Sequence, residues 1–135
     1  MIVVDVNVLA YLWIPGDLTM LAEAALARDP HWVSPILWRS EFRNILAGYL
    51  RRGALDRDAA ARCLDGAESQ IAGHEYLVPS DLVMGKVAAS TCSACDCEYV
   101  ALAEDLDAKL VTSDREILTA FPARTTSLKA FAEGA

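Results

Sequence analysis

Four carboxylate side chains occupy positions where acidic residues are unusual. Asp5 and Asp114 directly follow predicted strands, where a turn or a helix cap is the ordinary role of an aspartate. Glu41 and Asp96 fall among apolar residues on predicted helices, where a carboxylate is costly unless it is paired or binds a cation. A cluster of such carboxylates is typical of a Mg²⁺ or Mn²⁺ site.

Each of the two helical acids also has an ordinary explanation. Glu41 lies between Leu37 and Ile45 on the apolar face of its helix, and at the edge of that face it would reach a neighbouring arginine. Asp96 stands three residues after Ser93, a spacing at which its carboxylate can complete a helix cap. A helix N-terminus favours the ionised carboxylate, which is the form that binds metal, so the two roles of Asp96 are compatible.

A divalent cation held by four acids supports phosphodiester hydrolysis. Without a cation, four converging negative charges would raise one another's pKa values and destabilise the fold. A bound ion removes this repulsion, lowers the pKa of a water molecule and neutralises charge on the phosphate. His31 and His74 lie at the starts of predicted strands, at the opposite edge from Asp5 and Asp114, so a nuclease that uses two histidines as acid and base fits poorly.

The elements that must position these side chains alternate along the chain. Predicted strands cover residues 1–4, 31–34, 75–78, 109–113 and 124–126. Predicted helices cover residues 17–27 with Asp17 as cap, 35–53 starting at Pro35, 56–72 with Asp56 as cap, 81–89, 93–107 and 114–120. This alternation predicts an α/β fold with a parallel sheet of four to five strands and helices on both faces. Ligands of such sheets bind beyond the carboxyl ends of the strands.

Length and composition exclude several classes of protein. The 135 residues suit one domain, predicted to span residues 1–135, and 54% hydrophobic residues with a mean hydropathy of +0.25 exclude a disordered chain. The apolar first 14 residues are interrupted by Asp5 and Asn7, are too short to span a bilayer, and lack the basic segment and cleavage site of a secretory signal. We therefore expect a cytoplasmic protein with no membrane partner.

The net charge of −7 argues at first against a nucleic-acid partner. Its distribution changes this conclusion, because residues 28–62 carry seven basic and four acidic side chains, whereas residues 65–116 carry three basic and eleven acidic ones. Two divalent ions at the four acids would change the formal charge from −7 to about −3 where a phosphate must lie. Binding of RNA should therefore weaken when the metal is removed.

Three of the four cysteines form a C-x-x-C-x-C pattern at Cys92, Cys95 and Cys97. A structural zinc site needs a fourth ligand, which only the distant Cys63 or a histidine could supply. Disulfides are not expected in a cytoplasmic protein of this size. We interpret these residues as small buried thiols rather than zinc or iron–sulfur ligands.

Three sequence motifs follow one another over nearly the whole chain. They are VVDVNVL at residues 3–9, WRSEF at 38–42 with Asn44 after it, and a run from Ser93 to Asp114 that contains YVALA at 99–103 and LVTSD at 110–114. With these motifs the chain resembles the PIN-domain family, and most closely the VapC-like toxins of toxin–antitoxin pairs.

The resemblance implies a three-layer α/β/α sandwich and an endoribonuclease that depends on Mg²⁺ or Mn²⁺. The acidic quartet of the family corresponds to Asp5, Glu41, Asp96 and Asp114, and its supporting polar residues correspond to Asn7 and Thr112. The resemblance also implies an RNA substrate, a cognate antitoxin that covers the acidic site, and a toxin homodimer.

Two alternative functions remain open from the sequence. A PIN-like domain without catalytic activity would keep the fold and bind metal poorly, and the chain departs from the family at Val6, where Thr or Ser is common, and at Cys95 and Cys97, where Tyr and Ala are frequent. Phosphoryl transfer of the haloacid-dehalogenase type would use Asp5, but that chemistry needs a second aspartate at the position of Asn7.

Overall fold

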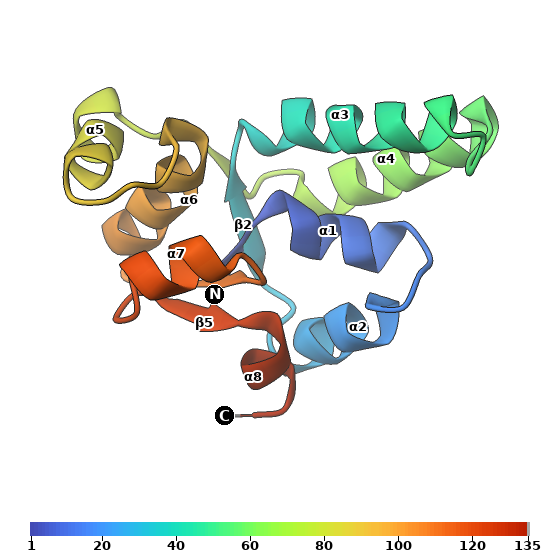
Figure 1. The fold of residues 1–135 in the computed structure, drawn as a ribbon. Helices are drawn as coiled ribbons and strands as arrows, with labels where there is room; N and C mark the ends of the chain where they lie inside the picture. Colours follow the sequence, from blue (N-terminus) through green and yellow to red (C-terminus); the bar gives the residue numbers. More distant parts are fainter. Residues whose placement is uncertain (135) are drawn as a thin grey trace.

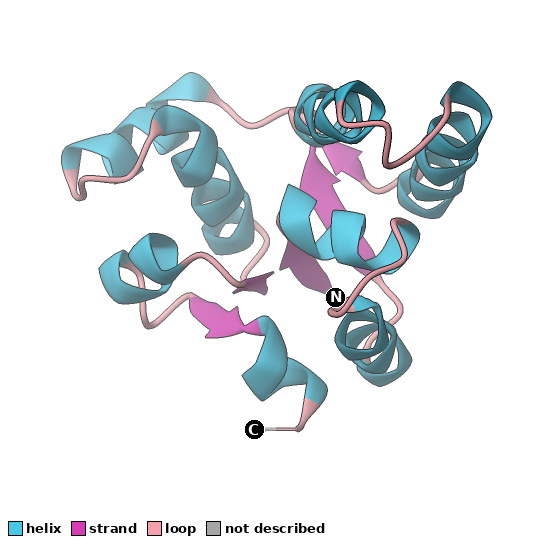
Figure 2. Ribbon diagram, turned by 45° about the vertical axis from the view of Figure 1, so that its right-hand side comes forward, coloured by secondary structure: helices cyan, strands magenta, loops and turns pink. Residues whose placement is uncertain are grey.

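A five-stranded parallel sheet forms the centre of the molecule in the computed structural model, which describes residues 1–134 (Figure 2). The strands are β1 (Ile2–Val4), β2 (Trp32–Pro35), β3 (Glu75–Tyr76), β4 (Lys109–Thr112) and β5 (Thr125–Ser127). Their order is β3-β2-β1-β4-β5, and all four pairings are parallel. The predicted α/β fold is confirmed, with five strands. Residue 135 of the predicted domain lies outside the described residues.

Helices cover both faces of this sheet. They are α1 (Val6–Trp13), α2 (Thr19–Arg28), α3 (Trp38–Arg51), α4 (Arg57–Ile71), α5 (Ser80–Ala88), α6 (Ala94–Asp105), α7 (Arg115–Ala120) and α8 (Leu128–Ala132). Helices α1 to α4 and α8 pack on one face, and α5 to α7 pack on the other, on the left in Figure 1. The result is the expected three-layer α/β/α sandwich.

The pleat of β1 divides the core into two parts. Ile2 and Val4 point into a cluster that includes Trp38 of α3, and Val3 points into a second cluster that includes Leu102 of α6. Successive side chains of a strand alternate between the two faces of a sheet, so a strand covered on both faces must be apolar throughout. This requirement explains the continuous apolar sequence of β1 and leaves Asp5 as the first polar residue after it.

Helix α1 was not predicted, because its eight residues lack a polar face. The helix begins after Asp5, whose Oδ1 accepts a hydrogen bond from the Val8 N–H at 3.1 Å, and its first turn is buried at Val6, Val8 and Leu9. A short buried helix has no amphipathic period, and its sequence resembles that of a strand. Asp5 is therefore a helix cap as well as a strand-end carboxylate.

The predicted start of the second long helix at Pro35 is wrong. Pro35 is the last residue of β2, and the helix begins at Trp38. The N–H groups of Ser34 and Ile36 donate to the carbonyls of His74, just before β3, and Tyr76, at 3.1 and 3.0 Å, so position 35 faces away from this ladder. A proline without an N–H group is tolerated there because β2 ends at that residue.

Three of the four predicted helix caps are confirmed, and the fourth is wrong. Asp56, Ser93 and Asp114 accept hydrogen bonds from the first turns of α4, α6 and α7, as predicted. The predicted cap at Asp17 is wrong, since α2 starts at Thr19 after Leu18 and has no side-chain cap. Helix α8 was not predicted from the sequence.

Within residues 1–134, we find no helix that combines the length and apolar character needed to cross a membrane.

Candidate active site

The carboxyl ends of the two central strands bring Asp5 and Asp114 to the same edge of the sheet. Strands β1 and β4 pair in parallel with Val4 opposite Val111, and the N–H of Asp5 donates to the Val111 carbonyl at 3.4 Å. Glu41 comes from the first turn of α3 and Asp96 from the first turn of α6. The four predicted site residues therefore come from four separate elements.

Thr112 connects the two strand-end aspartates. Its buried hydroxyl donates to Asp5 Oδ2 and accepts the Asp114 N–H at 3.0 Å. Asp114 Oδ1 in turn accepts the N–H groups of Glu116 and Ile117, at 2.8 and 3.3 Å, at the start of α7. These bonds fix both carboxylates relative to the sheet.

Glu41 pairs with a tyrosine instead of an arginine. The hydroxyl of the buried Tyr99, in α6, donates to Glu41 Oε1 at 2.7 Å. The neighbouring Arg39 instead forms ion pairs with Glu68 and Glu75, and its pKa is raised by these contacts. Burial raises the pKa of Glu41 despite the tyrosine hydrogen bond, and the Asp96 charge raises it further. The sequence did not predict this role of Tyr99, although its position three residues after Asp96 places it on nearly the same helix face.

Asp96 begins α6 beside other acidic groups. Its N–H donates to Ser93 Oγ at 3.1 Å, as the sequence predicts for a capped helix. Its pKa is nevertheless raised, first by burial and then by the charges of Asp114 and Glu116. The preference of a helix N-terminus for an ionised carboxylate is therefore outweighed at this position.

Electrostatic repulsion links the four carboxylates. Asp114 raises the pKa of Asp5 and of Asp96, and Asp96 raises the pKa of Glu41. Glu98 and Glu116, which the sequence analysis did not select, extend the acidic region: the pKa of Glu98 is raised by burial and then by Glu41, while the Glu116 charge raises that of Asp96. Among residues 1–134, no ion pair includes any of the four predicted acids.

Among the four acids, burial has its strongest effect on the pKa of Asp5, a residue that is only 5% exposed. Burial raises the pKa of this carboxyl from 3.8 to about 6, although hydrogen bonds from Thr112 and Val8 oppose the change. The folded protein therefore binds a proton at Asp5 more tightly than the unfolded chain does. This contribution favours folding at low pH and is lost as the pH rises through about 6.

We therefore expect the metal-free protein to be more stable at pH 5 than at pH 7.5. The contribution of Asp5 to this difference in unfolding free energy is on the order of 1 kcal/mol. Urea denaturation in EDTA at the two pH values measures it, with Asp5→Asn as the control in which the difference shrinks. A wild-type protein equally stable at both values, or more stable at pH 7.5, would contradict the assignment.

The four acids carry the oxygen donors that a hard cation prefers, but as oriented they do not form a complete coordination site. Their donors are all carboxylate oxygens, their charges repel one another, and Asp5 is buried without a cationic partner among the described residues. Within residues 1–134, however, no three His, Cys, Asp or Glu side chains converge closely enough to hold an ion as oriented. Side-chain rotation of Glu41, Asp96 or Asp114, which are only half-buried, would be needed to complete a site.

The other residues selected from the sequence are an asparagine, two histidines and four cysteines. Asn7 is exposed in the first turn of α1, two residues after Asp5. His31 and His74 precede β2 and β3, with ring centroids 4.8 Å apart, and so lie at the opposite edge, as predicted. Cys63, Cys92 and Cys97 are buried free thiols, whereas Cys95 is exposed, so the interpretation as buried thiols is wrong for Cys95 alone.

The fold and these side chains define an α/β/α protein with acidic residues gathered beyond the carboxyl ends of its parallel strands. The family model described as the PIN domain matches residues 2–121. The chain therefore belongs to the PIN domain family. The family predicted from the three sequence motifs is confirmed.

Individual proteins show the same relationship. Ribonuclease VapC3 of Pyrobaculum aerophilum is 30% identical over 128 residues, which cover 93% of this chain and 98% of that protein. The crystal structure of PAE2754 from the same organism has a TM-score of 0.78 at 22% identity and covers 98% of this chain and 93% of its own. FitAcB from Neisseria gonorrhoeae has a TM-score of 0.75 at 15% identity, with coverage of 95% and 98%. A structure of FitAB bound to an IR36 DNA fragment has a TM-score of 0.73 at 15% identity, with coverage of 96% of both chains.

Proposed function

We propose that this protein is an endoribonuclease that depends on Mg²⁺ or Mn²⁺ and acts as the toxin of a toxin–antitoxin pair. The observation that carries this proposal is the set of four mutually repelling carboxylates, contributed by four elements, at the sheet edge where α/β proteins bind ligands. The name of the relative that is 30% identical, a ribonuclease, supports RNA as the substrate. Cleavage of RNA agrees with the expected cytoplasmic location.

Asp5, Glu41, Asp96 and Asp114 would hold the cation. When bound, Mg²⁺ or Mn²⁺ supplies a water molecule of lowered pKa and neutralises charge on the phosphate. Thr112 and the first turn of α7 fix the two strand-end aspartates, and Tyr99 fixes Glu41. Asn7, exposed two residues after Asp5, would contact the RNA. No histidine among the described residues lies at this edge, so the protein holds the reacting groups without a histidine base.

We further propose two protein partners. The first is a cognate antitoxin that covers the acidic edge, as the likeness to VapC-like toxins implies. The second is another copy of this chain, forming a homodimer. Residues 1–135 would act as one nuclease domain in this assembly.

Removal of the metal should abolish RNA cleavage. We expect cleavage in Mg²⁺ or Mn²⁺ to fall at least about a hundredfold in excess EDTA and to return when Mn²⁺ is added, because the carboxylates alone repel a phosphate. The measurement is the initial rate of cleavage of a total RNA sample, with circular dichroism in EDTA as a control for folding. Cleavage that persists unchanged in EDTA by a folded protein would rule out the proposal.

A second candidate function is an RNA- or protein-binding PIN domain without appreciable catalysis. It is favoured by the lack of three converging metal-binding side chains among residues 1–134. Calorimetric titration with Mn²⁺ separates the two functions. Binding that disappears in Asp96→Asn supports the nuclease, and the lack of any binding supports the second candidate.

A further inference from the structure

A cavity of about 230 Å³ lies between α1, α3 and the connection from α1 to α2. Its walls include Asn7 and Tyr11 of α1, Ile45 and Tyr49 of α3, and Asp17 of the connection. Pockets for drug-sized molecules measure roughly 300–1,000 Å³, so this volume suits a smaller chemical group. We call this cavity the α1–α3 pocket.

The α1–α3 pocket begins beside the candidate active site. Glu41, Ile45 and Tyr49 follow one another at intervals of four residues, so they share one face of α3. Along that face the rise of a helix separates Glu41 from Tyr49 by about 12 Å. On α1, the first-turn residue Asn7 is followed four residues later by Tyr11, which lies further along the same face.

A hydrogen bond joins the other wall of the pocket to the acidic edge. The hydroxyl of Tyr11 lies 3.1 Å from the hydroxyl oxygen of Ser113, the residue that precedes Asp114. The pocket therefore has one wall continuous with Glu41 and another continuous with Asp5 and Asp114. An RNA chain whose cleaved phosphate lies at the four acids would therefore have a neighbouring nucleotide at the mouth of this pocket.

The pocket and its rim carry groups that recognise unpaired bases. Tyr11 and Tyr49 supply aromatic surface, and the Asn7 amide supplies both a donor and an acceptor. The Arg52 guanidinium lies over the Tyr49 ring, 4.6 Å from its centroid, and forms no ion pair with another described residue. Proteins read single-stranded RNA by stacking bases on aromatic rings and on arginine planes.

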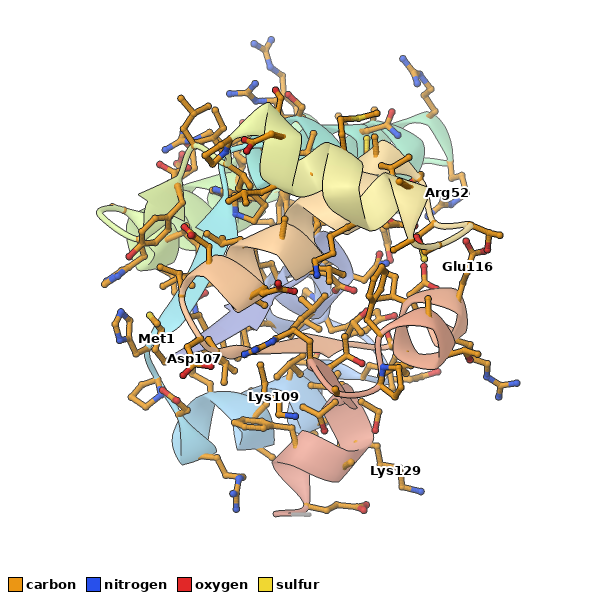
Figure 3. The ribbon with its side chains drawn as sticks, turned by 90° about the vertical axis from the view of Figure 1, so that its left-hand side faces the viewer. Met1, Arg52, Asp107, Lys109, Glu116 and Lys129 are labelled. Atoms are coloured by element: carbon orange, nitrogen blue, oxygen red, sulfur yellow. The ribbon has the colours of Figure 1, made fainter. Side chains whose placement is uncertain are left out.

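In the side-chain view, Arg52 lies toward the end of the molecule to which the strands point. Figure 3 labels Arg52 and Glu116, which follows β4, on the right, and Met1 and Asp107, which precede strands, on the left. Arg52 therefore lies at the end that carries the carboxyl edge of the sheet. Asp17 in the pocket wall would repel a phosphate, so a base enters the pocket and the phosphate stays at the rim.

We propose that the α1–α3 pocket binds one unpaired nucleobase of the RNA next to the cleaved phosphodiester. Tyr49 and Tyr11 pack against this base, Asn7 hydrogen-bonds its edge, and Arg52 contacts the adjoining phosphate. The inference rests on the proposed nuclease function and assigns part of its sequence preference to this pocket. The base is favoured over a peptide because the two aromatic rings lie on helix faces that lead to the four acids, and because Arg52, over the Tyr49 ring, forms no ion pair with another described residue.

The first test is cleavage by Tyr49→Ala, Tyr49→Phe and Arg52→Ala. We expect Tyr49→Ala to raise KM between about fivefold and a hundredfold, the range for one lost base–aromatic stack, and Tyr49→Phe, which keeps the aromatic ring, to raise KM by much less. Arg52→Ala should raise KM and weaken the salt dependence of binding. Arg57→Ala is the matched control, because it removes the same charge from an exposed position outside the pocket. Sequencing of the cleaved ends should show that Tyr49→Ala loses base preference at one position beside the cut.

The second test is binding, which does not depend on catalysis. Fluorescence anisotropy with labelled single-stranded hexamers of A, C, G or U compares the affinities of wild type and variants in EDTA, where all of them bind more weakly than with metal but none of them cleaves the RNA. Weaker binding by Tyr49→Ala and Arg52→Ala, with Arg57→Ala unchanged, supports the pocket even where cleavage is absent. Unchanged KM, base preference and hexamer affinity in both variants overturn the inference and leave the nuclease function intact. Variants that bind RNA normally but lose affinity for the antitoxin also overturn it, in favour of a protein-docking site.

Discussion

Replacing Asp5 with Asn is expected to lower the rate of RNA cleavage at least about a hundredfold without unfolding the protein. Loss of a residue that merely supports a metal ligand costs about 10- to 100-fold, so loss of the ligand itself should cost at least the upper value. The asparagine carbonyl can still accept the Val8 N–H that caps α1, and the substitution removes a buried charge whose pKa is raised to about 6. Metal-free Asp5→Asn should therefore remain folded at pH 7.5.

Asp56→Asn provides a matched control for this result. Asp56 caps α4 by accepting the Ala59 N–H at 2.7 Å, so the same substitution is made at the same kind of helix position, away from the acidic edge. We expect Asp56→Asn to cleave RNA at the wild-type rate. Asp96→Asn tests a second carboxylate and should also lose activity. Undiminished cleavage by both Asp5→Asn and Asp96→Asn would refute the proposed site.

Removal of the Thr112 hydroxyl is expected to have the second large effect. In Thr112→Val, Asp5 Oδ2 loses its hydrogen-bond donor and the Asp114 N–H loses its acceptor, in a position where Thr112 itself is fully buried. A buried group left without a partner costs about 1–3 kcal/mol of stability. Both carboxylates also lose orientation, so we expect cleavage to fall about 10- to 100-fold and Mn²⁺ to bind more weakly.

The control for this prediction is Thr112→Ser, which keeps the hydroxyl and removes only the methyl group. It should retain most of the Mn²⁺ affinity and most of the activity. Calorimetric Mn²⁺ titration and cleavage rates at saturating Mn²⁺ separate weaker metal binding from a slower reaction. The prediction fails if Thr112→Val binds Mn²⁺ as tightly as the serine variant.

The proline and helix-cap results show where local sequence rules hold. Asp56, Ser93 and Asp114 cap helices as predicted, because a side chain and the N–H groups that it accepts lie within three residues of each other. The position of Pro35 was predicted wrongly and α1 was missed, because both depend on neighbouring elements: the end of β2 accommodates Pro35, and the helices around α1 bury its apolar residues. Local periodicity carries no information about such neighbours.

The fold class, the family motifs and the four acidic positions could all be predicted from local sequence patterns. An apolar β1 followed by an acid, and an acid among apolar residues on a helix, are local patterns whose cost in a folded protein can be judged without coordinates. The tertiary structure alone decided what those acids contact. Thr112 reaches Asp5 across 107 residues, and Tyr99 reaches Glu41 across 58. These pairs and the α1–α3 pocket depend on strand order and helix packing, which bring distant segments together and leave no periodic trace in the chain.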